Sequence, residues 1–233
     1  LLYRDFIIDA KELTYDENTD IIVAGGGVVV SGETLTGNFP EATLNLKEDK
    51  IYFKGPINAT YNELNFTGEQ GIYDNVNETF EVLGKAIVTR ETDILEAERA
   101  FYTSKTGIVE VFGKKQKFIY TGEGRELTGN YAKYDVNKNL IEVPDKFEFK
   151  YSASSGNGKE GANGSGNALV LDTTTQKGTA KNIIINQGKD NLKGNTGELD
   201  LMNKIYKLKG KVIGNYGNYV INTEEVVYDE QSG

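Results

Sequence analysis

The sequence contains no cysteine, no histidine and no tryptophan among its 233 residues. Without thiols and imidazoles the chain cannot use a cysteine nucleophile or a serine–histidine relay, and it lacks the usual ligands of zinc, copper and haem. An enzyme of this composition would depend on carboxylates, alone or around calcium, or on lysine or tyrosine acting with them. We therefore expect that the protein is not an enzyme and carries no metal or cofactor.

Positive charge and long apolar runs are also scarce. The chain has 26 basic and 35 acidic residues, a net charge of −9, so it has no positive surplus to neutralise nucleic-acid phosphates. No run of 18 apolar residues occurs, and the charged start at residues 1–5 is too short for an intact signal peptide or a membrane span. The sequence does not begin with Met, which is compatible with removal of an upstream signal peptide or membrane anchor.

Only three prolines are present, whereas glycine occurs 27 times and tyrosine and phenylalanine 14 and 10 times. This profile is typical of many twisted strands joined by tight turns, with few helices.

A repeat of about 29 residues runs along the chain. Its anchor is a Tyr or Leu followed by Asp, Asn or Thr. The anchors are Tyr15, Leu44, Tyr73, Tyr102, Tyr134, Leu171, Leu199 and Tyr228, with spacings of 29, 29, 29, 32, 37, 28 and 29. Eleven residues after the anchor, five of the seven complete units have glycine: Gly26, Gly55, Gly84, Gly113 and Gly210.

Apolar residues recur at fixed places in this repeat. They stand seven residues before the anchor and seven, nine and thirteen after it. The last three positions share one parity with the glycine position, as residues on one face of a strand do. Each unit is therefore predicted to supply two strands whose inward face is apolar and narrowed by glycine. Lys115 falls in this inward column, and we expect its charge to reach water, a partner or a phosphate.

The residues after each anchor are rich in Asp and Asn, which stabilise turns through bonds from their side chains to the backbone. They predict hairpin loops and antiparallel strands. Between the fifth residue before the anchor and the anchor itself, apolar and polar residues do not alternate regularly. A bulge or a strand end is therefore expected there. The Gly- and Ser-rich stretch at about 152–166 explains the 37-residue spacing as an inserted surface loop.

The repeat, as in 127–143 and 94–113, resembles that of the LptA/LptC (OstA-like) family of periplasmic lipopolysaccharide-transport proteins. The resemblance covers all eight units. It implies one domain over residues 1–233, an elongated antiparallel β-jelly-roll of about 16 strands, open at its ends. It also implies a periplasmic protein of outer-membrane biogenesis, which shelters the acyl chains of lipopolysaccharide or a related amphiphile and bridges inner- and outer-membrane components.

The resemblance assigns lipid binding to the apolar interior. The residues expected to line it are Phe53, Phe66, Phe80, Val82, Val109, Val111, Phe147 and Leu208. The compact basic cluster of Lys114, Lys115 and Lys117 is a possible contact for phosphates, although solvated strand faces are the ordinary place for such lysines. Since the net charge repels phosphate, we expect the headgroup in solvent and the acyl chains inside.

Other interpretations remain open at this point. A 29-residue period also fits a β-solenoid surface or adhesin-like structural protein, which needs no ligand. A carbohydrate-active β-helix enzyme using Asp93, Glu96 and Glu98 is a further alternative, although nothing links these carboxylates to a cleft. Open sheet edges predict strand addition to other proteins of a transport bridge, or head-to-tail assembly of this chain.

Overall fold

The computed structural model describes residues 1–113, 115–122, 125–151 and 161–229, and within these ranges the chain forms 19 strands and no helix. The described residues therefore contain no helix that is long and apolar enough to cross a membrane. The chain divides into two compact units, Leu1–Gln116 (unit 1) and Lys117–Gly233 (unit 2). The prediction of a single domain stays a prediction.

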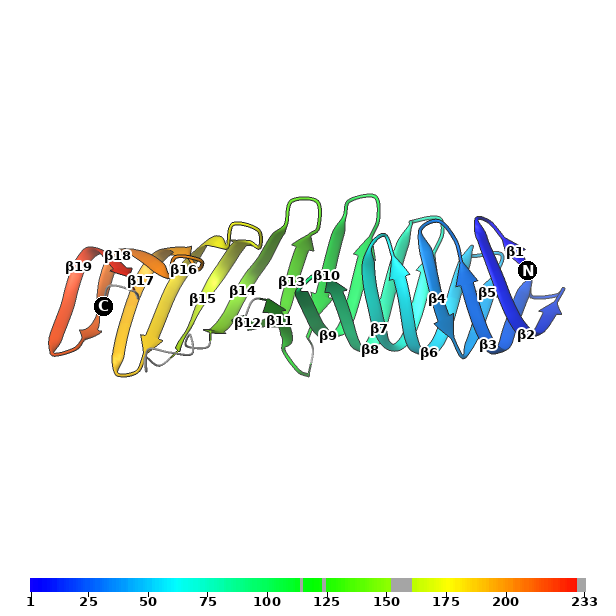
Figure 1. Cartoon of the computed structure of the whole chain (residues 1–233), viewed down its shortest axis with the longest axis horizontal. Coiled ribbons are helices and arrows are strands. Elements are labelled where there is room, and N and C mark those ends of the chain that lie inside the picture. The colour runs from blue at the N-terminus through cyan, green and yellow to red at the C-terminus, as the bar shows by residue number, and fades with distance from the viewer. Residues whose placement is uncertain (114, 123–124, 152–160, 230–233) are drawn as a thin grey trace. The chain divides into compact units, whose positions relative to one another are not determined.

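Unit 1 is an antiparallel meander in which each hairpin continues into the next (Figure 1). Its strands are β1 (Leu2–Tyr3), β2 (Phe6–Asp16), β3 (Ile21–Ser31), β4 (Leu35–Phe39), β5 (Glu41–Asn45), β6 (Lys50–Tyr61), β7 (Leu64–Asp74), β8 (Thr79–Arg90), β9 (Asp93–Thr103) and β10 (Ile108–Phe112). β4 and β5 are two halves of one interrupted strand, because both pair with β3 and β6.

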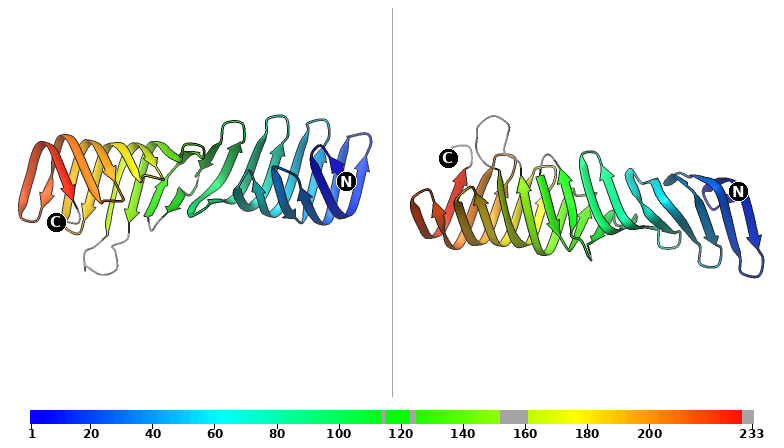
Figure 2. Two further views of the ribbon diagram at one scale, coloured as in Figure 1. Left: turned by 45° about the horizontal axis from the view of Figure 1, so that its top comes forward. Right: turned by 90° about the horizontal axis from the view of Figure 1, so that it is seen from below.

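Unit 2 repeats this arrangement, as the two further views show (Figure 2). Its strands are β11 (Phe118–Gly122), β12 (Arg125–Gly129), β13 (Tyr131–Asp135), β14 (Leu140–Tyr151), β15 (Ala162–Asp172), β16 (Lys177–Gln187), β17 (Asp190–Asp200), β18 (Ile205–Tyr216) and β19 (Tyr219–Asp229). The antiparallel pairing confirms the predicted hairpins and the all-β class, is consistent with a β-jelly-roll, and excludes the parallel coils of a solenoid.

Each long strand is divided into two arms by a shift of register near its middle. In the β6–β7 hairpin, residues 50–54 pair with 70–74 and residues 57–61 pair with 64–68. We call the half next to the four-residue loops the loop-side arm and the half next to the tight turns the turn-side arm. The break coincides with the predicted loss of parity before the anchor and confirms it.

The two arms of a hairpin face each other, with the core between them. A straight strand of the length of β7 would hold its ends roughly 30 Å apart. Instead, the ring centroids of Tyr61, at the tight turn, and Tyr73, at the far end of β7, lie 5.7 Å apart. The bend therefore turns one sheet into two layers, and apolar residues of both arms can pack together.

The glycines eleven residues after the anchor have a different role from the one predicted. Gly26, Gly84 and Gly210 have φ angles of 75°, 72° and 74° and lie within the register shifts of β3, β8 and β18. Since the left-handed region suits glycine, these residues form the bulges at which the strands bend. The prediction that these three glycines narrow the inward face is wrong, because a Cβ on them would meet the polar side chains of Lys11, Glu69 and Asn195 and not the core.

The four-residue loops form a regular stack. In all seven complete repeats, the fifth residue after the anchor has a positive φ: Asp20, Asp49, Glu78, Gly107, Asn139, Gln176 and Lys204. Within unit 1 the N–H groups of Leu46, Asn75 and Ser104 donate to the carbonyl of this residue in the preceding loop, at 3.0, 3.1 and 3.0 Å. Each loop is thus hydrogen-bonded to its neighbour, and the Asp- and Asn-rich composition supports turn geometry as predicted.

The predicted surface loop at about 152–166 is too long by its last residues. β15 begins at Ala162, and residues 152–160 lie outside the described part of the chain. Its glycines have a packing reason. A Cβ on Gly164 or Gly166 would lie 2.5 Å and 2.8 Å from ring atoms of Phe149 and Phe147. At Gly164 and Gly166, aromatic rings therefore occupy the space that side chains would fill.

Candidate functional site

The apolar interior predicted from the repeat is the core of each unit. The eight residues expected to line it are all exposed by 2% or less: Phe53, Phe66, Phe80, Val82, Val109, Val111, Phe147 and Leu208. The first six belong to unit 1 and the last two to unit 2. The structure thus confirms that these positions are inward and places them where only the chain's own side chains reach.

The interior of unit 1 is an aromatic cluster that joins the two arms. Phe66 on the turn-side arm and Phe80 on the loop-side arm meet edge to face, with centroids 5.2 Å apart. Phe39 stacks on Phe53 across the same space at 3.9 Å, and Phe53 contacts Phe80 at 6.3 Å. Each such pair stabilises the fold by about 0.5–1.5 kcal/mol beyond the contribution from burying the two rings. The arms are therefore held together by dispersion and apolar burial.

Unit 2 has a smaller set of rings. Phe147 lies 6.3 Å from Phe149, and Tyr206 stacks on both Tyr151 and Tyr228 at 6.2 Å. The other buried residues of unit 2 include the rings of Phe118, Tyr120 and Tyr134 and aliphatic residues, among them Ile141, Val143, Ile183, Ile185 and Leu208.

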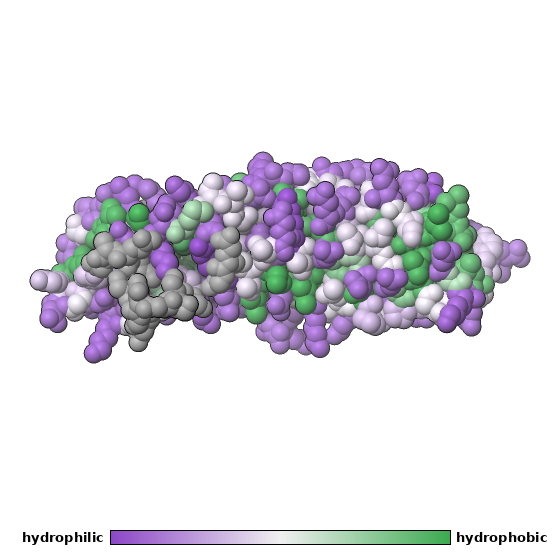
Figure 3. Space-filling model, in the orientation of Figure 1, coloured by the Kyte–Doolittle hydropathy of each residue, from purple (hydrophilic) through white to green (hydrophobic). Residues whose placement is uncertain are grey.

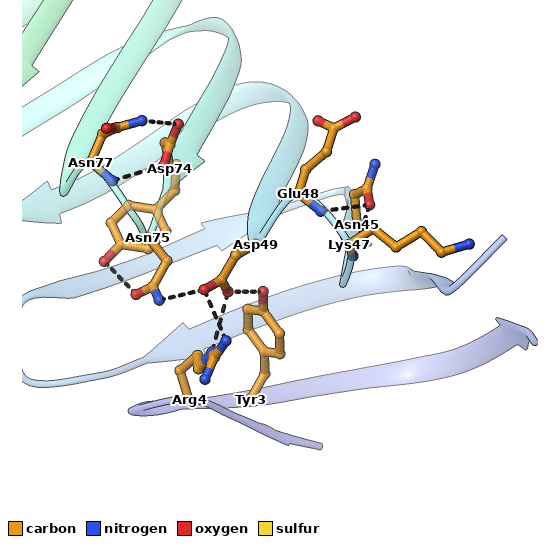
Figure 4. A network of polar contacts seen from close by, with 10 residues as sticks. Tyr3, Arg4, Asn45, Lys47, Glu48, Asp49, Asp74, Asn75 and Asn77 are labelled. Carbon is orange, nitrogen blue, oxygen red and sulfur yellow. Dashed lines mark hydrogen bonds and ion pairs between the residues drawn. The ribbon is translucent and has the colours of Figure 1, made fainter.

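The two arms of unit 1 meet along a seam where tight turns approach four-residue loops, and one polar network spans it (Figure 4). The hydroxyl of Tyr3 donates to Asp49 Oδ1 at 2.5 Å, and the guanidinium of Arg4 contacts both carboxylate oxygens of Asp49 at 3.2 and 3.0 Å. Asn75 Nδ2 donates to Asp49 Oδ2 at 3.0 Å. The β1–β2 turn is thereby fastened to the loop between β5 and β6.

Titration within this network follows from its geometry. Burial, followed by the hydrogen bond to Asp49, raises the pKa of Tyr3 to about 12. Burial alone would raise the pKa of Asp49, but hydrogen bonds from Tyr3, Asn75 and Arg4 outweigh it and hold that pKa below its ordinary value. Tyr3 is therefore neutral and Asp49 charged throughout the neutral range.

A second contact crosses the seam farther along unit 1. Asn62, in the turn between β6 and β7, donates from Nδ2 to Ser104 Oγ at 2.7 Å, and Ser104 lies in the loop after β9. Beside it, the ring of Tyr61 packs on Tyr73 and Tyr102 at 5.7 and 5.4 Å. Sequence reasoning marked Tyr73 and Tyr102 as anchors but missed this role. The aromatic anchors themselves are visible in the sequence. Their partner Tyr61 lies across the bend, and the repeat spacing does not show which residue that is.

The predicted basic cluster lies only partly within the described residues, and its role as a phosphate contact stays a prediction. Lys114 lies outside the described residues. Lys117 Nζ binds Glu148 Oε1 at 2.6 Å within unit 2. Lys115 is exposed, and its N–H donates to Glu98 Oε1 at 2.6 Å. The prediction that Lys115 faces inward is therefore wrong. The repeat that begins at Tyr102 has three additional residues, so the inward position falls on Phe118, which is fully buried.

The first and last strands leave apolar side chains exposed. β2 pairs with β1 only through Phe6 and Ile7, and beyond that point Leu13 and Tyr15 are 49% and 56% exposed. The space-filling view shows hydrophobic surface gathered over the first strands (Figure 3). In unit 2, Tyr219 and Val220 on β19 are 75% and 84% exposed. Within the described ranges, both strands present an edge of the kind that accepts a further strand.

No protein-family model matches the chain, and no curated protein matches it in sequence. Among solved structures it is similar to LptH of Pseudomonas aeruginosa, described as the LptA-homologous periplasmic component of the conserved lipopolysaccharide transport device. The similarity covers 58% of this chain and 92% of that one, with 15% identity and a TM-score of 0.45. A likeness of this size assigns neither a family nor a function to the chain.

Proposed function

We propose that the protein is a periplasmic carrier for lipopolysaccharide or a related amphiphile, and that it bridges membrane components during outer-membrane biogenesis. The observation that carries the proposal is the apolar interior of bent antiparallel hairpins in each unit. Its inward columns repeat along the chain in the pattern that resembles the LptA/LptC family. Binding requires no covalent step, because each buried methylene contributes about 0.8 kcal/mol.

The chemistry of the surface supports an orientation for such a ligand. The net charge of −9 opposes a phosphate-bearing headgroup near the protein. The acyl chains would therefore lie between the arms, against Phe53, Phe66, Phe80 and their neighbours, with the headgroup in solvent. Of the two described lysines of the basic cluster, Lys115 is the better placed for a phosphate, since it is exposed and Lys117 is paired with Glu148.

The strand edges support the bridging part of the proposal. A strand from another bridge component, or from a second copy of this chain, would add backbone hydrogen bonds to β2 or β19 and cover apolar residues such as Leu13 and Val220. Light scattering is expected to show oligomers that grow with concentration. A strict monomer over the accessible range would count against head-to-tail assembly of this chain.

Photocrosslinking with lipopolysaccharide tests the carrier. A photoreactive amino acid replaces Phe80, which faces inward and is fully buried, or its strand neighbour Glu81, which has the opposite parity and pairs with Arg99 on the outer face. A crosslink at position 80 and none at 81 is expected. Equal labelling at both positions would show that the lipid does not enter the interior. Absence of labelling at both would leave an antiparallel repeat protein whose apolar columns are core alone.

A further inference from the structure

We propose that the seam of unit 1 is a gate, and that an alkyl chain enters the interior only when the contact between Asn62 and Ser104 opens. The inference rests on the proposed carrier function and adds to it the route of entry. It starts from the closed state of the interior: Phe66, Phe80 and Val82 have no exposed surface. A ligand between the arms must therefore first separate them.

The backbone of unit 1 allows such a separation. Each strand pairing runs along one arm: residues 79–83 of β8 pair with 99–103 of β9, and residues 86–90 pair with 93–97. The arms are connected at the bulges, where Gly84 and Gly26 adopt positive φ. Rotation about this line of bulges parts the arms and leaves the sheet hydrogen bonds of each arm in place. Between the described residues of unit 1, opening breaks the hydrogen bonds across the seam and the packing between the two apolar faces.

The hydrogen bonds across the seam differ in strength from one end of unit 1 to the other. At the β1 end, Asp49 receives hydrogen bonds across the seam from Tyr3 and from Arg4, the second charge-assisted from a guanidinium. At the Asn62 end the hydrogen bonds between described residues are all neutral: Asn62 donates to Ser104, and the hydroxyl of Tyr61 is hydrogen-bonded with Ser104 and Tyr73. The seam is therefore easier to part at Asn62, next to Tyr61, whose ring centroid lies 6.0 Å from that of Phe80.

The absence of cysteine makes a covalent lock a clean test. Asn62→Cys with Ser104→Cys places two thiols across the seam. Thr60→Cys with Asn65→Cys is the matched control, because Thr60 and Asn65 are paired neighbours on the turn-side arm whose side chains are hydrogen-bonded at 2.9 Å. Both disulfides lie near the same turn. One closes the seam, and the other joins strands within one arm.

The assay is the rate of fluorescence increase when cis-parinaric acid, an 18-carbon fatty acid, is added to the full chain. The oxidised seam lock is expected to take up the probe at least about ten-fold more slowly than its reduced form, while the control pair is unchanged by oxidation. Equal rates for the oxidised and reduced lock would overturn the gate and leave the carrier standing. Failure of the wild-type chain to bind the probe would overturn the carrier and the gate together.

A second pair of variants covers the case in which the lock does not form. Asn62→Gly removes the bond across the seam and keeps the positive φ of 47° at this turn without strain, whereas Thr60→Ala removes a bond of similar kind within one arm. Loss of one neutral hydrogen bond shifts an opening equilibrium by about five-fold. Uptake by Asn62→Gly is expected to be faster by about that factor and uptake by Thr60→Ala unchanged. The same rate in both would contradict the gate.

Discussion

Truncation of Phe80 measures how tightly the interior of unit 1 is filled. Its ring is fully buried and lies 5.2, 6.0 and 6.3 Å from the rings of Phe66, Tyr61 and Phe53. Phe80→Ala removes the ring from a site enclosed on both arms and leaves a cavity that rigid neighbours cannot collapse. We expect the free energy of unfolding to fall by about 3–5 kcal/mol.

The matched control for this variant is Tyr15→Ala. Tyr15 occupies an inward anchor column but is 56% exposed, because β2 is the first long strand and little of the described chain covers that part of it. Its truncation is expected to cost about 1 kcal/mol. Urea unfolding followed by circular dichroism gives both values. A loss below about 1.5 kcal/mol for Phe80→Ala would refute the closed aromatic core, since it would show that the ring is already in contact with water.

Three further outcomes are expected. Gly55→Ala places a Cβ 2.0 Å from the carbonyl oxygen of Glu69 and should lower stability by about 1–3 kcal/mol in urea unfolding, whereas Gly25→Ala meets nothing within 4 Å and should change it by less than about 0.5 kcal/mol. Gln176→Gly relieves a positive φ of 57° and removes a buried amide oxygen without a hydrogen-bond partner, so the melting temperature should rise; a fall would contradict this reading of the turn. Because the pKa of Asp49 is lowered in the folded state, its contribution is complete above the ordinary aspartate pKa of about 3.9 and is lost as pH falls through the lowered value. The difference in melting temperature between the wild type and Asp49→Asn should therefore be present at pH 6 and shrink toward pH 2, and a constant difference would exclude the ionised carboxylate as its source.

The predictions that succeeded depend on local periodicity. Alternation of apolar and polar residues after each anchor places Phe80 and Val82 inward and Glu81 outward, and their burial agrees. Asp and Asn at the loops predict hairpins, and the carboxylate of Asp172 accepts the N–H groups of Thr174 and Thr175 at 2.9 and 2.8 Å. These features are decided within a few residues, so they are visible in the sequence.

The predictions that failed involve a change of register. Counting from the anchor predicts that Lys115 is inward, but three additional residues in this repeat shift the column to Phe118. The spacing also predicts that the glycines after the anchors lie on the inward face, although Gly84 lies at a bulge with positive φ. A count from the anchor therefore fails where residues are inserted, as before Phe118, and at the bulge itself, where the backbone leaves the regular alternation of a strand.

The sequence by itself determined the repeat, the two-strand unit, the turn chemistry and the identity of the inward columns, because each depends on short-range alternation and on the conformational preferences of single residues. Only the tertiary structure decided that every long strand bends, that the two arms enclose the core, and that Asn62 meets Ser104 and Tyr3 meets Asp49 across a seam. These partners lie 42 and 46 residues apart. Their approach is set by the bend angle at the bulges and by ring packing between the arms, which no local pattern encodes.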